Sequence, residues 1–201
     1  MGEKQQFQPL TREDTITVVL YRTGIVLSAA IISVLAYFLM RGTSGTIPAG
    51  SSRQLDVLAY GLYGAIGLSV FFIHLYIRKF HTFLKNLYFA GIGCLAVLLV
   101  IGKGSLAGAL SQSASSSLLL LPLSGCLGFV TAKEAFCFKL FEGYFLALAM
   151  PFYLLLVASG SLTGRGASYG LALVAGLLVV FTLRKVFMPI AYDIGDKSAY
   201  R

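Results

Sequence analysis

The sequence predicts an all-α membrane protein, a polytopic bundle of about six transmembrane helices with both termini on the cytoplasmic side. Only 12% of the 201 residues are charged and 57% are hydrophobic, with a mean hydropathy of +0.83, whereas a soluble domain carries about 25% charged residues. The hydrophobic residues form long stretches, and Lys and Arg gather at alternate ends of these stretches. This pattern indicates that lipid is the solvent for most of the chain.

Each apolar stretch has the length that an α-helix needs to cross a bilayer, which is about 17–25 residues. The stretches cover residues 15–40, 55–77, 83–101, 116–138, 143–160 and 168–187. Backbone polar groups in lipid must pair within their own segment, so these stretches are expected to be helices. Continuous apolar runs such as residues 118–121 lack the alternation of a barrel strand.

The first helix is expected to begin before the membrane. Thr11 with Asp14 three residues later fits a capping box, and the acidic Glu13 and Asp14 suit the positive end of a helix dipole. The polar residues 1–14 form a cytoplasmic segment in this prediction. No signal peptide is expected, because the first apolar run is longer than such a segment and lacks a cleavage site behind it.

The connectors are short, so no soluble domain is expected. Residues 41–53 and 102–115 are rich in Gly and Ser, residues 15–187 form the transmembrane domain, and residues 188–201 form a cytoplasmic tail. Twelve of the 16 Lys and Arg residues fall on the side of the N-terminus. The other four are Arg41, Arg53, Lys103 and Arg165. The positive-inside rule therefore places both termini in the cytoplasm.

Two prolines fall inside the fourth and fifth predicted helices. Pro122 and Pro151 remove backbone donors and predict kinks, and interrupted helices are typical of transporter sites. Pro122 lies near the start of its helix, where a kink costs little. Pro151 is therefore the stronger indication of such a site.

An unusual pair of charged residues, Lys133 and Glu134, lies inside the fourth apolar stretch. A charge at mid-membrane costs about 2.5–3.5 kcal/mol. Lysine can extend to the interface, but Glu134 needs a partner, and we predict an intramembrane pair with Arg22. The pair fits three interpretations: a packing contact without chemistry, a docking or ligand site, and a proton or ion relay.

Other polar residues are predicted at a similar depth, on the cytoplasmic face. This docking or polar cluster comprises Lys133, Cys137, Lys139, Glu142 and His74. His74 fits either a hydrogen-bonded packing residue or a ligand to a pigment metal.

No cofactor or metal site is predicted elsewhere. The three cysteines, Cys94, Cys126 and Cys137, lack metal-binding spacing and are expected to be free thiols. Despite the net charge of +8, nucleic acid is not an expected partner, because the basic residues punctuate apolar runs instead of forming one patch.

Two short motifs carry a family resemblance. The hexapeptide KEAFCF (residues 133–138) and the YRTG stretch (residues 21–24) resemble a family of uncharacterised integral membrane proteins of cyanobacteria and plastids, a domain of unknown function. The similarity extends from about residue 11 to residue 183. It implies a photosynthetic membrane, either the thylakoid or the plasma membrane of a cyanobacterium-like cell, and exposure of KEAFCF to cytoplasm or stroma. It supplies no catalytic residues.

These observations favour a non-enzymatic accessory protein that assists the assembly or stability of a photosynthetic membrane complex, with residues 133–142 as its docking surface and pigment as a further contact. The alternative is a small-solute or ion transporter with a polar site near Glu134. An intramembrane enzyme ranks below both, because no nucleophile and base can be paired; Ser124, for example, has no histidine to activate it.

Overall fold

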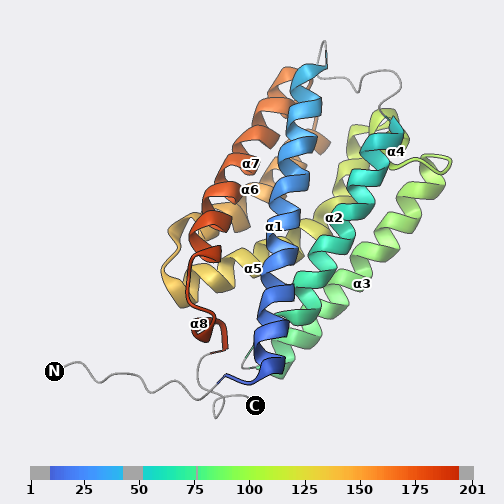
Figure 1. Cartoon of the computed structure of the whole chain (residues 1–201). Coiled ribbons are helices and arrows are strands. Elements are labelled where there is room, and N and C mark those ends of the chain that lie inside the picture. The colour runs from blue at the N-terminus through green and yellow to red at the C-terminus, as the bar shows by residue number, and fades with distance from the viewer. Residues whose placement is uncertain (1–9, 43–51, 76, 195–201) are drawn as a thin grey trace.

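The computed structural model describes residues 10–42, 52–75 and 77–194, and the regular secondary structure of these residues is entirely helical (Figure 1). Six segments in it are long and apolar enough to cross a membrane. They are α1 (Arg12–Arg41), α2 (Ser52–Phe72), α3 (Arg78–Ile101), the joined η1 (Ala114–Leu120) and α5 (Leu121–Phe138), α6 (Phe141–Ala158) and α7 (Arg165–Val186). Two short helices, α4 (Leu106–Gln112) and α8 (Ala191–Ile194), complete the described fold. The predicted fold class, a bundle of six membrane-spanning helices, is confirmed.

Helix α1 lies between α2 and α7 on the near side of the bundle (Figure 1). It packs most extensively against α2 and α7, while α5 packs against α6 and α3. The start of α1 and the short helix α8 lie at the same end of the bundle (Figure 1). Which side of a membrane this end faces remains a prediction from the positive-inside rule.

The start of α1 has the predicted capping box. The backbone N–H of Thr11 donates to the Asp14 carboxylate at 2.9 Å, and the Asp14 N–H donates to the Thr11 hydroxyl at 3.2 Å. These two bonds satisfy backbone N–H groups at the start of the helix, which have no carbonyl partner within the helix. With 30 residues, α1 is about 45 Å long, which exceeds the roughly 30 Å hydrocarbon core.

Helices α1 and α2 approach closely at Gly24. A β-carbon on Gly24 would lie 2.6 Å from the carbonyl oxygen of Ala65 and 2.8 Å from the backbone nitrogen of Ser69. In the space that glycine leaves, the Ser69 hydroxyl donates to the carbonyl of Tyr21 at 3.2 Å. Small residues at helix contacts are typical of membrane bundles, where backbone approach replaces the hydrophobic effect.

The fourth predicted span is not one continuous α-helix. It begins as the 3₁₀-helix η1 and becomes α-helical at Leu121, with Pro122 as the second residue of α5. Proline suits this position because the first turn of a helix needs no backbone donor. Pro151, by contrast, lies inside α6, as predicted.

Two segments predicted to be irregular are packed against the bundle. The connector 102–115 contains α4, whose Leu106, Ala107 and Ala109 are buried, and the Asp56 carboxylate accepts the Ala107 N–H at 2.8 Å. The predicted tail 188–201 begins with a packed segment, since α8 buries Asp193 and Ile194. Residues 195–201, most of the connector 41–53 and most of the N-terminal segment 1–14 lie outside the described residues.

Candidate functional site

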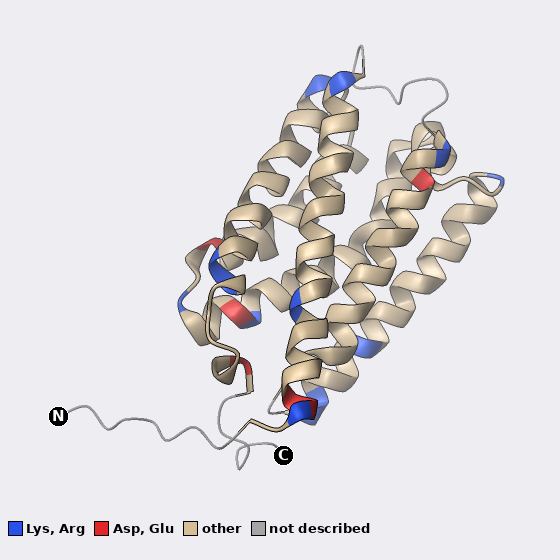
Figure 2. Ribbon diagram, in the orientation of Figure 1, with Lys and Arg blue, Asp and Glu red and all other residues tan. Residues whose placement is uncertain are grey.

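A chain of buried charges lies where α1, α5, α7 and α8 meet. Figure 2 shows most charged residues at the two ends of the bundle, with a further group inside it. The members of this charge chain are Arg22, Asp193, Lys185, Glu134 and Lys133, in that order of contact. None of the five side chains is more than 12% exposed. Positive and negative groups alternate along the chain, so that each carboxylate lies between two cations.

The first end of the charge chain ties α1 to the chain segment that follows α7. The Nε and Nη2 atoms of Arg22 both lie 2.7 Å from one Asp193 oxygen. Its remaining N–H groups donate to the backbone carbonyls of Val186, Met188 and Pro189 at 2.6–3.2 Å. Carbonyls at the end of a helix lack helical partners and carry partial negative charge. Arg22 therefore satisfies the end of α7 and holds residues 187–194, which we call the C-terminal strap.

The centre of the charge chain is Lys185, which is fully buried. Its ammonium group contacts both Asp193 and Glu134 and lies 4.0 Å from the centre of the Phe138 ring. An aromatic face attracts a cation, especially where water is excluded. Lys185 thus links the strap to α5.

Glu134 is fully buried and is held from three helices. Lys133 of α5 donates to one of its oxygens at 2.8 Å, and the Tyr21 hydroxyl of α1 donates to the same oxygen at 2.7 Å. Lys185 of α7 contacts the other oxygen. Lys133 is the second end of the charge chain, and its ammonium lies 5.7 Å and 6.0 Å from the rings of Tyr21 and Phe138.

The predicted direct pair between Arg22 and Glu134 is wrong. Arg22 is bonded to Asp193, and Glu134 is bonded to Lys133, Lys185 and Tyr21. The two residues belong to one charge chain, but Lys185 and Asp193 stand between them. The prediction missed that Lys185, a cation from α7, contacts Glu134.

The sequence analysis does not single out Lys185 or Asp193 as site residues. Lys185 follows Arg184 at the end of an apolar stretch, and it was counted there as an interfacial charge of the positive-inside type. Asp193 was assigned to the tail. One signal could have identified it: residues 188–194 are mostly apolar around a single aspartate, which suggests a packed segment more than a solvated tail.

The other predicted cluster residues are dispersed around the charge chain. Cys137 and Lys139 are exposed, and Lys139 ends α5 in the left-handed conformation, with φ of 55°. Glu142 accepts two bonds from Arg184 at 2.8 and 2.9 Å, which joins the start of α6 to the end of α7. The structure thus places these residues at the α5–α6 turn and not within the charge chain.

His74 lies between α2 and α3, beside the start of α1. Its Nε2 atom is 3.3 Å from the Thr17 hydroxyl, and its buried Nδ1 atom has no partner among the described residues. Burial, with the nearby Lys133 charge, lowers the pKa of His74, so the ring is neutral at pH 7. Pigment ligation through His74 remains a prediction. No three His, Cys, Asp or Glu side chains come together as a metal site within the described ranges.

The charge chain suits cohesion better than chemistry. It holds three cations and two carboxylates, and its members already use one another as partners. Burying a charge is tolerable only when it is paired and hydrogen-bonded. Ser124, the candidate nucleophile considered from sequence, donates to the Leu121 carbonyl of its own helix at 2.9 Å.

The fold and the charge chain define the class of this protein, which is an integral, multi-pass helical membrane protein with a buried network of ion pairs. Within that class, the chain belongs to the family described as uncharacterized integral membrane protein (DUF2301), whose family model matches residues 68–201. The matched range includes KEAFCF and Asp193 and begins after YRTG. No curated protein matches the chain, and no solved structure matches it.

Proposed function

We propose that this protein is a non-enzymatic accessory protein of a photosynthetic membrane, where it assists the assembly or stability of a larger membrane complex. The photosynthetic setting, a thylakoid or plasma membrane of a cyanobacterium-like cell, rests on the resemblance of the KEAFCF and YRTG motifs. The non-enzymatic role is supported by the charge chain, whose polar groups are occupied by one another.

The observation that carries the proposal is a group of exposed aromatic residues around the α5–α6 turn. Phe136 and Phe187 are 81% and 84% exposed, and Phe141 is 67% exposed. The exposed Lys139 lies in the same turn, and the Arg184–Glu142 ion pair brings the end of α7 to the start of α6. We call Phe136, Lys139, Phe141 and Phe187 the docking surface.

This docking surface has the composition of a protein contact. Aromatic side chains supply large contact areas and dominate the binding energy of many interfaces. The charge chain adjoins the surface along the polypeptide, since Glu134 lies two residues before Phe136 and Lys185 lies two residues before Phe187. The ion pairs fix the ends of α5 and α7 relative to each other, which lowers the entropy lost when a partner binds.

Co-purification in mild detergent tests this proposal. A tagged chain should retain a photosynthetic complex or an assembly intermediate, and the double variant Phe136→Ala/Phe187→Ala should lower its recovery by about tenfold or more, because each buried aromatic anchor contributes about 1–2 kcal/mol. Val100→Ala is the matched control, since Val100 is 80% exposed at the far end of α3. Recovery of free protein alone across several detergents would contradict the proposal. So would a loss of the complex in Val100→Ala equal to the loss in the double variant.

The transport alternative has less support from the geometry. It requires water to reach Glu134, and this side chain is fully buried, with Lys133, Lys185 and Tyr21 around its oxygens. A relay through the charge chain would have to break several charge-assisted contacts for each proton moved.

A further inference from the structure

The start of α3 carries two exposed cations to which the protein supplies no partner. Arg78 and Lys79 are the first two residues of α3, and both are exposed. Neither side chain makes an ion pair, a hydrogen bond or a ring contact with a residue that the structure describes. By contrast, the ammonium of Lys85, further along α3, lies 5.6 Å from the centre of the Phe71 ring. The two cations at the start of α3 are therefore available to a group from outside the protein.

The length of α3 places these cations at the level of lipid headgroups. Its 24 residues form a helix about 36 Å long, which is about 6 Å longer than a hydrocarbon core of roughly 30 Å. With Ile101 at the far boundary of that core, about one turn at the start of α3 extends into the headgroup layer. Arg78 and Lys79 belong to this turn.

Two exposed aromatic residues follow the cations. Phe80 and Phe83 are 49% and 56% exposed, and the ring of Phe80 lies 6.1 Å from that of Phe129 in α5. Phe83 comes four residues after Lys79, so the two side chains share one face of α3, with the ring about one turn closer to the hydrocarbon. A cation at the phosphate level beside a ring at the acyl level matches the two parts of a phospholipid. We call Arg78, Lys79, Phe80 and Phe83 the α3 patch.

The carboxylates of the described residues are engaged elsewhere. Those of the charge chain and of Glu142 pair with cations, and Asp56 accepts a backbone N–H of α4. Glu13 and Asp14 lie in the first turn of α1, where negative charge suits the helix dipole. The α3 patch thus presents positive charge that the described part of the chain does not neutralise, at the depth where a bilayer has its phosphates.

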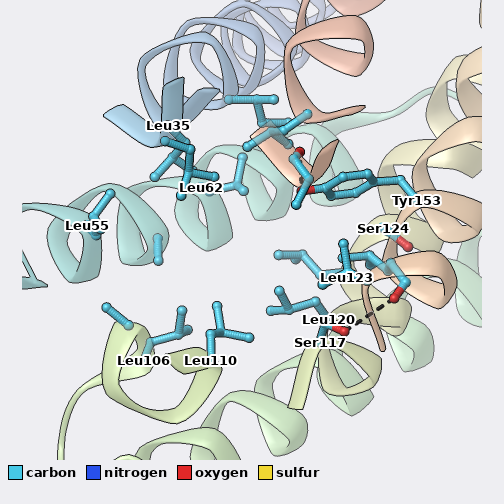
Figure 3. Close-up of a pocket in the computed structure, with 18 of the residues that line it drawn as sticks. Leu35, Leu55, Leu62, Leu106, Leu110, Ser117, Leu120, Leu123, Ser124 and Tyr153 are labelled. Atoms are coloured by element: carbon cyan, nitrogen blue, oxygen red, sulfur yellow. Dashed lines mark hydrogen bonds between the residues drawn. The ribbon is translucent and has the colours of Figure 1, made fainter. Parts of the chain in front are cut away.

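Another feature of the bundle, a large apolar cavity, offers no headgroup site. Its volume is about 810 Å³, and its walls include Leu35, Leu62, Leu106 and Leu120 (Figure 3). No charged side chain among the described residues lines it. The cavity gives an anionic headgroup no counter-charge to replace its hydration, so selectivity for such a headgroup has to come from charges at the surface.

We propose that the α3 patch binds an anionic phospholipid, with the phosphate held by Arg78 and Lys79 and the upper part of an acyl chain against Phe83. Arginine and lysine both bind phosphate through charge-assisted hydrogen bonds, and each cation near a bilayer surface attracts anionic lipid. The proposal rests on the membrane-spanning fold and not on the accessory role, because the docking surface lies at the ends of other helices, α5, α6 and α7.

Short-chain lipids test this proposal on the purified full chain in dodecyl maltoside micelles. Dioctanoyl-phosphatidylglycerol is the anionic probe, and dioctanoyl-phosphatidylcholine is its match, with the same acyl chains and phosphate but no net charge. The thermal unfolding midpoint is followed during each titration, because a ligand that binds the folded state raises it. Wild-type protein should bind the anionic probe more strongly. Arg78→Gln/Lys79→Gln should weaken that binding by about fivefold for each cation removed, which brings it close to binding of phosphatidylcholine.

Two further variants and a soluble anion serve as controls. Arg53→Gln/Arg165→Gln removes two exposed cations from the starts of α2 and α7 and should bind like wild type. Arg78→Lys/Lys79→Arg keeps both charges of the α3 patch and should keep the preference for the anionic probe. Inorganic phosphate at the same concentration should leave the wild-type midpoint unchanged, because it has no acyl chain to place against Phe83.

Several results would overturn the proposal. Equal binding of the two lipids by wild type would mean that headgroup charge is not recognised. A preference that persists in Arg78→Gln/Lys79→Gln would place the lipid elsewhere, and an equal loss in Arg53→Gln/Arg165→Gln would reduce it to an effect of total charge. Stabilisation by inorganic phosphate as large as that by phosphatidylglycerol would make the ligand a soluble anion.

An acidic protein is the other partner that two free cations fit, and the same variant separates it from lipid. Loss of a co-purified complex from Arg78→Gln/Lys79→Gln, with lipid binding unchanged, would assign the α3 patch to such a protein and contradict the proposal. These results leave the test of Phe136 and Phe187 unaffected, because that test alters the docking surface alone.

Discussion

At the scale of single residues, the two short motifs of the sequence meet in one place. In YRTG, Tyr21 donates to Glu134, Arg22 binds Asp193, and Gly24 admits α2 against α1. In KEAFCF, Lys133 and Glu134 belong to the charge chain, and Phe138 covers Lys185. Motif residues that are far apart in sequence therefore share one contact network, which explains why neither motif follows a plain hydrophobic pattern.

The partner of Glu134 can be identified by mutation. Glu134→Ala leaves Lys185 and Lys133 without this carboxylate, and we expect a loss of about 3 kcal/mol in the free energy of unfolding, measured by denaturant titration in micelles. Lys185→Met should recover part of this loss in the double variant, and Arg22→Met should not, because Arg22 pairs with Asp193. Glu142→Ala is the control, since its partner Arg184 is 54% exposed, and such pairs contribute about 0–1 kcal/mol. Rescue by Arg22→Met alone would refute the assigned contacts.

Gly24 offers a second test at this scale. A methyl group there would overlap the backbone of α2, so Gly24→Ala should push α1 and α2 apart and destabilise the fold by about 1–3 kcal/mol. Gly64→Ala is the matched control, because a β-carbon on Gly64 meets no atom within 4 Å; it should be neutral or slightly stabilising through helix propensity. Unfolding midpoints of the two variants decide the matter, and equal effects would contradict the close approach at Gly24.

At the scale of elements, the C-terminal strap is held by polar contacts as well as by the packing of Met188 and Ile194. It is short, and its described part ends in the four-residue helix α8, which is too short to be stable by itself. Arg22 supplies bonds to Asp193 and to three backbone carbonyls around the start of the strap. In α8, the ring of Tyr192 approaches that of Phe138 edge-on, with 6.4 Å between the ring centres.

Arg22→Gln should therefore release the strap while leaving the six spans in place. The expected result is much faster hydrogen exchange in residues 187–194, because local opening is governed by the contacts that hold a segment. Peptides from α2 and α3 should keep their protection. Arg184→Gln is the matched control, since Arg184 makes an exposed ion pair on the same helix end and should not alter strap exchange. Unchanged exchange in Arg22→Gln would mean that packing holds the strap.

At the scale of the whole molecule, the sequence was sufficient for the fold class and insufficient for the contacts of the charges. Span length and hydropathy act within a segment, so the six helices and the capping box at Thr11 could be predicted. The partner of Glu134 depends on how α5, α7 and α8 are rotated and packed, which hydropathy does not encode. The cavity could not be predicted for the same reason. Its walls come from segments that are distant in the sequence, and the lining residues cannot be told from other apolar residues there.

The orientation of the bundle is a prediction about the whole molecule that these helices now make testable. Arg41, Arg53, Lys103 and Arg165 lie at or beside the end of α1, the start of α2, the end of α3 and the start of α7. These helix ends lie at the end of the bundle away from the start of α1 (Figure 1). The opposite end, where α1 begins, should face the cytoplasm, because the other twelve Lys and Arg residues fall toward that side and positive charge is retained there during insertion.

Cysteine labelling in intact cells checks this orientation. In cells that carry the chain in their plasma membrane, and in a background without Cys94, Cys126 and Cys137, an impermeant thiol reagent added from outside should label Ser161→Cys in the α6–α7 turn. Lys139→Cys in the α5–α6 turn should react only after the membrane is opened. Both turns flank α6, so opposite labelling follows from a single crossing. The reverse pattern would mean that the positive-inside rule fails here, and equal labelling of both sites in intact cells would mean that α6 does not cross the membrane.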